Sequence, residues 1–343
     1  GIRPSAANGA PVTSTGCPSL DAVLSGHGGL PTGSLFFIEE SGTTDFASVL
    51  LRYFAAEGLL QGHTVWLGGG LPESWFRSLP LVTDKSSSTE SSASSRNAAS
   101  SAAEQERMKI AWRYQSLPDF GSGVRERPPT TSQETQPGSA KDLYCHAYDL
   151  TKRLTLAPEM QYTVSPSCAP SSATGSADPF APLLASLIQT LTETTGFIRA
   201  VIPFLLSPAL YPPGASQPRH FIRFLNNLRL VCRQYPHRIA IMATLPLDLY
   251  PRNTSMTTWA EILSDGVLEL TPLPSPTSDV TALETSSMSM AGDPTGPQGL
   301  LKLIKIPQLE RWSAGSEVDL AFKVTRKRFS IEAWSLPALG EEE

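Results

Sequence analysis

Cysteine is scarce in this sequence, and the few cysteines lack the spacing that disulfide frameworks and metal sites need. The four lie far apart, and none forms a C-x-x-C pair or a His-spaced set: Cys17, Cys145, Cys168 and Cys232. We therefore expect reduced thiols inside a cell and no metal site. Long apolar runs are also lacking, because none approaches the ~20 residues of a membrane span. No membrane is expected among the partners.

An excess of positive charge is absent too. Lys and Arg number 27 against 32 Asp and Glu, so the formal net charge is 27 − 32 = −5. This total does not exclude nucleic-acid binding, because local patches decide that rather than the sum. With 343 residues and 40% hydrophobic content, the chain has ample material for one large core. We expect a single domain over residues 1–343.

Serine-rich and proline-rich segments interrupt that domain. Nine of the sixteen residues at positions 86–101 are serine. Such a composition cannot bury enough apolar surface to offset the entropy of ordering the chain. We predict low-complexity insertions at about residues 84–107, 121–141, 165–177 and 272–298.

Outside the insertions, the hydrophobic pattern alternates between strand and helix. An apolar strand at residues 35–38, a helix at 45–60 and a strand at 63–67 form a βαβ unit. The alternation returns with a helix that starts at Asp178 and Pro179, followed by a strand at 197–206, a helix at 218–234, a strand at 239–243, a helix at 258–264 and a strand at 267–270. Antiparallel strands are predicted at 300–306, 319–325 and 328–334. The predicted class is α/β, with a central, mostly parallel sheet flanked by helices and with C-terminal antiparallel strands.

The loop between the first strand and helix of this unit stands where P-loop ATPases hold nucleotide. A working loop, G-x-x-x-x-G-K-[ST], cradles phosphates with backbone N–H groups and neutralises them with its Lys. Here the loop keeps one glycine and has no Lys: Gly42, Thr43, Thr44 and Asp45, preceded by Glu39 and Glu40. Carboxylates near the expected phosphates repel them by several kcal/mol at ~4 Å. We predict a degenerate phosphate loop.

Two further positions that nucleotide hydrolysis uses lack carboxylates. The strand at 197–206 carries Pro203 near the place of a magnesium-binding Asp, and the strand at 63–67 ends in Gly68, Gly69 and Gly70 where a Glu would orient water. No catalytic residue and no cofactor is therefore assigned. A generic βαβ unit that was never a P-loop is the alternative interpretation of these absences.

Two motifs near the N-terminus decide between these interpretations. Residues 14–24 contain T-G-x-x-x-L-D, and residues 28–34 contain G-G-x-P-x-G-S. Together they resemble the opening of RecA-type ATPases of the recombinase and circadian-kinase branch. Within that superfamily the chain is most similar to the Elongator complex protein 4 family. The segments that carry this resemblance are residues 35–46, 51–58, 109–115, 148–153, 201–203 and 329–339.

The resemblance implies a RecA-like fold without ATPase signatures and an accessory role rather than an enzymatic one. It also implies assembly with the fifth and sixth Elongator subunits in a hetero-hexameric ring, which docks on the catalytic Elongator subunits. The complex modifies wobble uridines in tRNA, the ring binds tRNA, and the cytoplasm, with the nucleus as a second compartment, is the expected location. A stand-alone RecA-like ATPase with an atypical nucleotide site and a pure assembly scaffold stay open as alternatives.

Candidate RNA or subunit contacts lie in three places. On the helix at 218–234, basic side chains fall within an arc of about 120°, opposite the apolar ones: Arg219, Arg223, Arg229 and Arg233. The loops after two central strands offer Tyr211, Tyr250 and Arg252, which suit base stacking and phosphate pairing. A C-terminal basic set ranks below them: Lys302, Lys305, Lys323, Arg326, Lys327 and Arg328. An ordinary solvated surface remains the alternative for the helix and the loops, and protection of exposed strand edges is the alternative for the C-terminal set.

Overall fold

A computed structural model describes residues 1–24, 28–83, 143–168, 178–273, 296–307 and 320–334. Except for Thr83, these residues belong to one compact unit built from residues 1–82 and 141–343. Residues 83–140 form a separate unit, which apart from Thr83 lies outside the described residues. The predicted insertions at 84–107 and 121–141 lie outside them as well, as do residues 169–177 and 274–295 of the other two.

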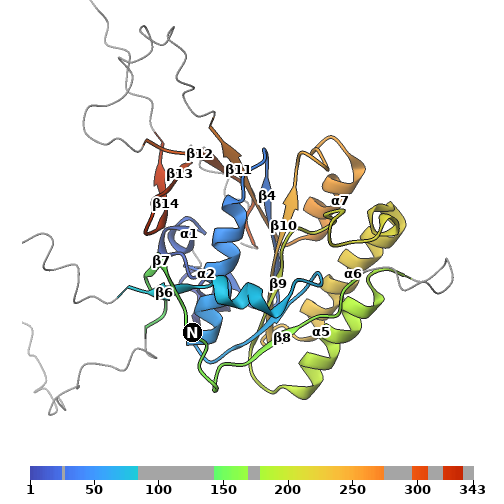
Figure 1. The fold of residues 1–343 in the computed structure, drawn as a ribbon, viewed down its shortest axis with the longest axis horizontal. Helices are drawn as coiled ribbons and strands as arrows, with labels where there is room; N and C mark the ends of the chain where they lie inside the picture. Colours follow the sequence, from blue (N-terminus) through green and yellow to red (C-terminus); the bar gives the residue numbers. More distant parts are fainter. Residues whose placement is uncertain (25–27, 84–142, 169–177, 274–295, 308–319, 335–343) are drawn as a thin grey trace, which may run out of the picture. The chain divides into compact units, whose positions relative to one another are not determined.

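A nine-stranded sheet forms the centre of the described unit (Figure 1). Its strand order is β14-β13-β12-β11-β4-β10-β9-β5-β8. The strands from β11 to β8 run parallel, whereas β11 to β14 pair antiparallel. The parallel strands are β4 (Leu35–Glu40), β5 (Thr64–Leu67), β8 (Tyr162–Val164), β9 (Ile198–Ile202), β10 (Ile239–Pro246) and β11 (Gly266–Pro272). The antiparallel ones are β12 (Gly299–Lys305), β13 (Leu320–Val324) and β14 (Phe329–Ala333).

Helices cover both faces of this sheet, with α1 and α2 on one side and α5, α6 and α7 on the other (Figure 1). Because successive strand residues point to opposite faces, β4 contributes Phe36 and Ile38 to the core under α2, and Leu35 and Phe37 to the core under α6. The helices are α1 (Pro18–Val23), α2 (Phe46–Leu60), α5 (Ala181–Glu193), α6 (Pro218–Gln234) and α7 (Ser255–Leu263).

Small elements surround the main sheet. The N-terminal segment forms a three-stranded sheet from β1 (Ile2–Pro4), β2 (Pro11–Thr13) and β3 (Leu30–Pro31). A two-stranded antiparallel sheet pairs β6 (Pro80–Val82) with β7 (Tyr148–Arg153). Two short 3-10 helices are η1 (Glu73–Ser78) and η4 (Pro213–Ser216).

The predicted fold class is confirmed: a mostly parallel α/β sheet with helices on both faces and antiparallel strands at the C-terminal end. Helix α6 has the predicted bounds, because Pro218 is compatible with the first helical turn and the apolar side chains follow one face. Its buried residues are Phe221, Phe224, Leu225, Leu228, Val231 and Cys232.

Four element boundaries differ from the sequence prediction by three residues or more, and one of them is the end of β10, at Pro246 rather than at residue 243. Helix α5 begins at Ala181, because Asp178 instead closes a turn by accepting a hydrogen bond from the Phe180 N–H at 3.0 Å. Strand β9 ends at Ile202 rather than at residue 206: Pro203 lacks an N–H, and Phe204 has a positive φ of 51° that no strand tolerates. Helix α7 begins at Ser255, three residues before the predicted start.

Candidate functional site

The segment that would be a phosphate loop turns from β4 into α2. Gly42 has φ +88°, a left-handed conformation that other residues rarely adopt, and this explains why the glycine is kept. The turn brings the end of β4 close to the first N–H groups of α2. In α/β sheets this edge, at the carboxyl ends of parallel strands, is where ligands bind.

The Glu40 carboxylate occupies the N-terminus of α2. Its Oε1 accepts hydrogen bonds from the Phe46 N–H and the Thr44 hydroxyl, both at 2.8 Å, and its Oε2 accepts one from the Ala47 N–H at 3.0 Å. Glu40 is buried, and this burial raises the pKa of its carboxyl although the three hydrogen bonds act in the opposite direction. The first N–H groups of a helix are a ready site for an anion. In this chain a side chain of the preceding strand fills that site.

Glu39 points to the opposite face of the sheet and binds Arg252. The guanidinium donates to three carboxylates at 2.6 Å each: Nη2 to Glu39, Nε to Glu261 and Nη1 to Glu269. Glu39 is fully buried, Glu261 comes from α7 and Glu269 from β11. Arg252 therefore connects the end of β4 to α7 and to β11.

This cluster holds three carboxylates and the single guanidinium of Arg252, and the pKa of Glu39 responds both to burial and to the neighbouring charges. Burial is the main cause that raises the pKa of Glu39 to about 7, the charges of Glu261 and Glu269 raise it further, and Arg252 opposes them. The same carboxylates raise the pKa of Arg252 against the effect of burial. Among the described residues, Glu39 Oε1 has no hydrogen-bond partner.

The strand ends that would supply catalytic carboxylates are packed with other groups. A side chain at Gly68, after β5, would lie 2.8 Å from the Trp66 ring, and one at Gly69 would lie 2.9 Å from the Tyr211 hydroxyl. Pro203 follows β9, as the sequence indicates. In the described residues, no three His, Cys, Asp or Glu side chains are grouped so that they could hold a metal ion.

The two loop tyrosines do not lie where base stacking requires them. Tyr211 is 4% exposed and its ring packs 5.9 Å from that of Phe180, so no base can reach its face in this conformation. The Tyr250 hydroxyl donates to the Leu206 carbonyl at 3.0 Å, and its ring packs against the core. Arg252 is held by its three carboxylates. In this conformation the two tyrosines pack within the chain and Arg252 is ion-paired, so none of the three presents a free side chain to RNA, and their role as RNA or subunit contacts stays a prediction.

The arginines of α6 keep the basic face that the sequence predicts. Arg219 and Arg233 are exposed, and Arg223 is 71% exposed with its Nε 3.8 Å from Asp178. Arg229 is half-buried. The four arginines therefore remain candidates for a contact with phosphate or an acidic neighbour.

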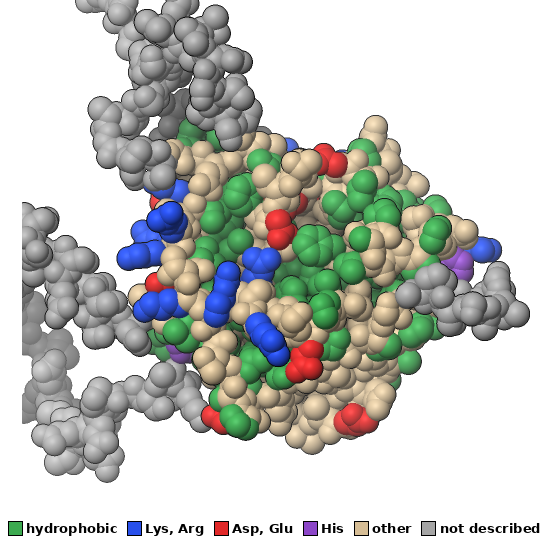
Figure 2. All heavy atoms as spheres, in the orientation of Figure 1, with side chains coloured by type: hydrophobic (Ala, Val, Ile, Leu, Met, Phe, Trp, Pro, Cys, Tyr) green, Lys and Arg blue, Asp and Glu red, His purple; other side chains and the backbone are tan. Residues whose placement is uncertain are grey.

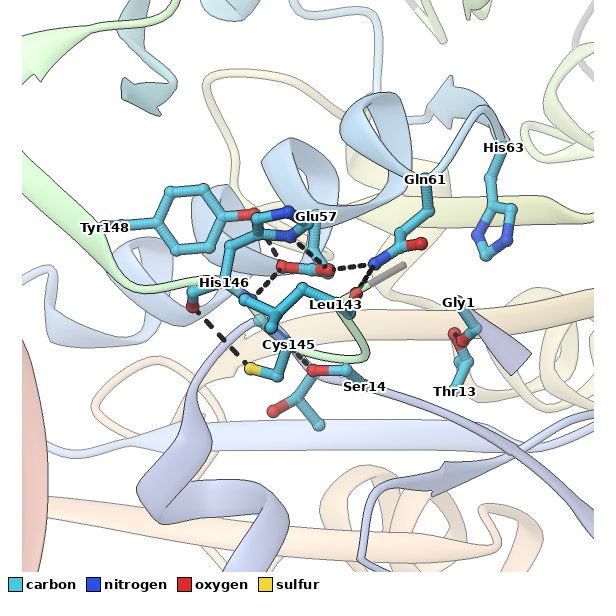
Figure 3. Close-up of polar contacts among 12 residues, drawn as sticks. Gly1, Thr13, Ser14, Glu57, Gln61, His63, Leu143, Cys145, His146 and Tyr148 are labelled. Carbon is cyan, nitrogen blue, oxygen red and sulfur yellow. Dashed lines mark hydrogen bonds and ion pairs between the residues drawn. The ribbon is translucent and has the colours of Figure 1, made fainter. Parts of the chain in front are cut away.

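A buried polar network that the sequence did not suggest ties α2 to residues 143–148 (Figure 3). The Glu57 carboxylate accepts hydrogen bonds from the His146 N–H and ring at 3.0 Å, and from the Tyr148 hydroxyl and the Gln61 amide at 2.7 Å. Burial alone would raise the pKa of Glu57, but these hydrogen bonds and the charge of Arg199 lower it to about 2.

Arg199 of β9 is the cation of this region and is fully buried. Its guanidinium donates to His63 Nδ1 at 3.1 Å, to the Thr13 hydroxyl at 2.7 Å and to the carbonyls of Ser14 and Phe54. Burial and the charge of Arg199 lower the pKa of His63 to about 3, so that ring stays neutral and accepts. An Arg inside an otherwise apolar strand was the only sequence signal for this network.

The N-terminal motifs have structural roles in this arrangement. Asp21 accepts hydrogen bonds from the Ser14 hydroxyl at 2.6 Å and from the Thr15 N–H and hydroxyl at 2.8 and 2.7 Å. Gly16 has φ +81°, and a Cβ there would lie 2.4 Å from the Tyr53 carbonyl oxygen. These residues fix the N-terminal segment against α2.

The chain is similar in sequence to known proteins over its whole length. The chain matches the PAXNEB protein family over residues 1–343. It is 38% identical over 352 residues to Elongator complex protein 4 of Schizosaccharomyces pombe, covering 100% of this chain and 90% of that protein. It is 28% identical over 369 residues to Elongator complex protein 4 of Saccharomyces cerevisiae, covering 98% and 76%. A solved KaiC-like protein, PH0186 of Pyrococcus horikoshii, is similar with a TM-score of 0.47 and 10% identity, covering 94% of this chain and 98% of that one.

Proposed function

The chain belongs to the PAXNEB family, and we propose that it acts as a non-catalytic subunit of the Elongator complex. The family match covers residues 1–343, and relatives of the chain are named Elongator complex protein 4. Membership in this family makes other Elongator subunits its partners.

The Glu40 carboxylate is the observation that carries the non-catalytic role. Because it accepts the Phe46 and Ala47 N–H groups, a nucleotide phosphate at the start of α2 would have to displace a buried, hydrogen-bonded side chain. It would also meet like charge, which is unfavourable by about 4 kcal/mol for each unit charge at 4 Å near a protein surface. No Lys in the loop offsets that repulsion. The segment therefore serves as a structural turn.

The finer parts of the proposal follow the family resemblance. The chain would join the fifth and sixth Elongator subunits in a hetero-hexameric ring, and that ring would bind tRNA in support of wobble-uridine modification. A role in tRNA modification would locate the protein in the cytoplasm, with the nucleus as a second compartment. The exposed arginines of α6 support a contact with phosphate or with an acidic neighbour. Among the described residues, no helix is long and apolar enough to cross a bilayer.

The assembled complex offers the test of this role. The full chain carries an affinity tag and is purified from its own cells, and we expect the other Elongator subunits to co-purify. ATP hydrolysis by that assembly should be unchanged when Thr44 is replaced by Val, because the Thr44 hydroxyl donates to Glu40 and, on this proposal, takes no part in hydrolysis. Glu332→Gln, an exposed change on β14, is the matched control. A drop of tenfold or more in the Thr44→Val assembly alone would refute the non-catalytic role.

A further inference from the structure

Six exposed cations gather on one side of the described unit and are referred to below as the basic patch. They come from three segments that are distant in sequence, namely η1, the exposed end of β7 and the turn between β13 and β14: Arg77, Lys152, Arg153, Arg326, Lys327 and Arg328. Figure 2 shows Lys and Arg side chains concentrated where Figure 1 places β14, β7 and β6.

Hydrogen bonds hold these segments side by side. The Leu150 N–H of β7 donates to the Lys327 carbonyl at 2.8 Å, so the hairpin turn lies against β7. Arg153 Nη1 donates to the Ser78 carbonyl at 2.9 Å, and Ser78 directly follows Arg77. Hydrogen bonds from Thr151, and then the charges of Lys152 and Lys327, lower the pKa of Asp149, which places both lysines near one carboxylate.

The acids of these segments do not neutralise the patch. Asp149 is 8% exposed, and its Oδ1 accepts both the N–H and the hydroxyl of Thr151. Glu73 of η1 accepts the Tyr162 hydroxyl at 2.6 Å. Six cations therefore face solvent beside two carboxylates that are already hydrogen-bonded, in a chain whose formal charge is −5.

The side chains of the patch favour a polyanion over a folded protein surface. Protein interfaces have an apolar core with aromatic anchors, whereas nucleic-acid interfaces are polar and strongly positive. Among the described residues, the exposed large hydrophobic side chains lie elsewhere, and none belongs to η1, to β7 or to the hairpin turn. Four of the six cations are arginines, whose planar fork matches phosphate oxygens.

We propose that the basic patch binds the phosphate backbone of RNA. This inference rests on the proposed function for its biological substrate, tRNA, but it assigns the contact to residues that the sequence pattern ranks last or does not single out. Phosphate contacts position an RNA without reading its sequence, so the patch would contribute affinity and orientation to the complex rather than base specificity.

The turn itself allows a clean test because its backbone does not depend on the three charged side chains. The Thr325 N–H donates to the Arg328 carbonyl at 2.9 Å, and the Thr325 hydroxyl accepts the N–H groups of Lys327 and Arg328. We therefore replace Arg326, Lys327 and Arg328 together by Ser in the full chain within its purified complex. A matched triple variant makes the same change in net charge elsewhere, with Glu at Ala181, Ala185 and Thr192, three exposed positions of α5.

Binding of a labelled tRNA transcript is measured against salt concentration. We expect the patch variant to weaken binding tenfold or more near 0.1 M salt and to reduce the log–log salt slope by about 2 to 3, with the matched variant changing both far less. Equal losses in the two variants, or a loss in the matched variant alone, would overturn the proposal.

Two further arms separate RNA binding from a disturbed turn and from binding of an acidic protein segment. Lys152→Glu with Arg77→Glu tests the patch without touching the turn, and it should weaken tRNA binding to a similar extent. Poly-glutamate serves as a probe for an acidic protein segment: if the patch variant loses poly-glutamate binding but keeps tRNA affinity, the surface binds protein and the proposal fails. Co-purification of the other Elongator subunits with each variant separates failure of this inference from failure of the proposed function.

Discussion

Replacing Glu40 by Ala should destabilise the fold more than any exposed Glu replacement, because its carboxylate completes the start of α2. Three hydrogen bonds disappear, and two of their donors are the backbone N–H groups of Phe46 and Ala47. Hydrogen bonds to a charged acceptor contribute about 1.5–3 kcal/mol each, and loss of a helix cap costs about 0.5–2 kcal/mol.

These terms do not add in full. The raised pKa of the Glu40 carboxyl means that burying the charge is itself unfavourable, which offsets part of the gain. We therefore expect Glu40→Ala to lower the free energy of unfolding by about 3 kcal/mol and Glu40→Gln, which keeps one acceptor oxygen, by about 1–2 kcal/mol.

The assay is urea unfolding of the full chain, in which the midpoint concentration of urea is compared between variants. An unchanged slope m shows that the compactness of the native and unfolded states is the same in each variant. Glu332→Ala, on the exposed part of β14, is the control and should change stability by no more than about 0.5 kcal/mol. If Glu40→Ala matches that control, Glu40 does not stabilise the start of α2 and the argument fails.

Four further outcomes follow from the buried groups. Glu39 has a folded-state pKa of about 7 against its usual 4.5, so the native state binds the proton more tightly and stability should decline by at most about 3 kcal/mol as pH rises from about 4.5 to about 7; Glu39→Gln should flatten that decline in unfolding measured at several pH values. Glu57, with a pKa of about 2, stabilises the fold above its usual pKa of 4.5 and loses that contribution as pH falls toward 2, so Glu57→Ala should cost about 3–5 kcal/mol near neutral pH and leave a smaller acid-side loss. Tyr211→Phe should change the unfolding free energy by less than about 0.5 kcal/mol, because its buried hydroxyl has no hydrogen-bond partner among the described residues, and should leave tRNA affinity of the complex unchanged. Arg252→Ala should lower the unfolding midpoint but not tRNA affinity, and the reverse result would restore its predicted RNA role.

Much of the fold follows from local signals in the sequence. Helix α6 is predictable to the residue because Pro218 suits its first turn and apolar side chains recur on one face. The end of β9 is not, because it depends on the positive φ of Phe204, a backbone feature that the apolar run hides.

The candidate site was predictable only in part. Side chains alternate along a strand, so the sequence implies that Glu39 and Glu40 point to opposite faces and have different contacts. The phosphate-loop pattern alone indicates only that both carboxylates repel phosphate. The partners could not be predicted in the same way. Arg252 meets three carboxylates from different elements, and Lys152 approaches Lys327, only through tertiary packing.

Equilibrium binding of labelled ATP with magnesium to the full chain measures whether the anion site of α2 is open to a phosphate, because the Glu40 carboxylate fills that site. We expect no saturable binding up to about 1 mM ATP, for the natural chain and for Gly42→Ala and Thr44→Val alike. Micromolar affinity that disappears in either variant would contradict it.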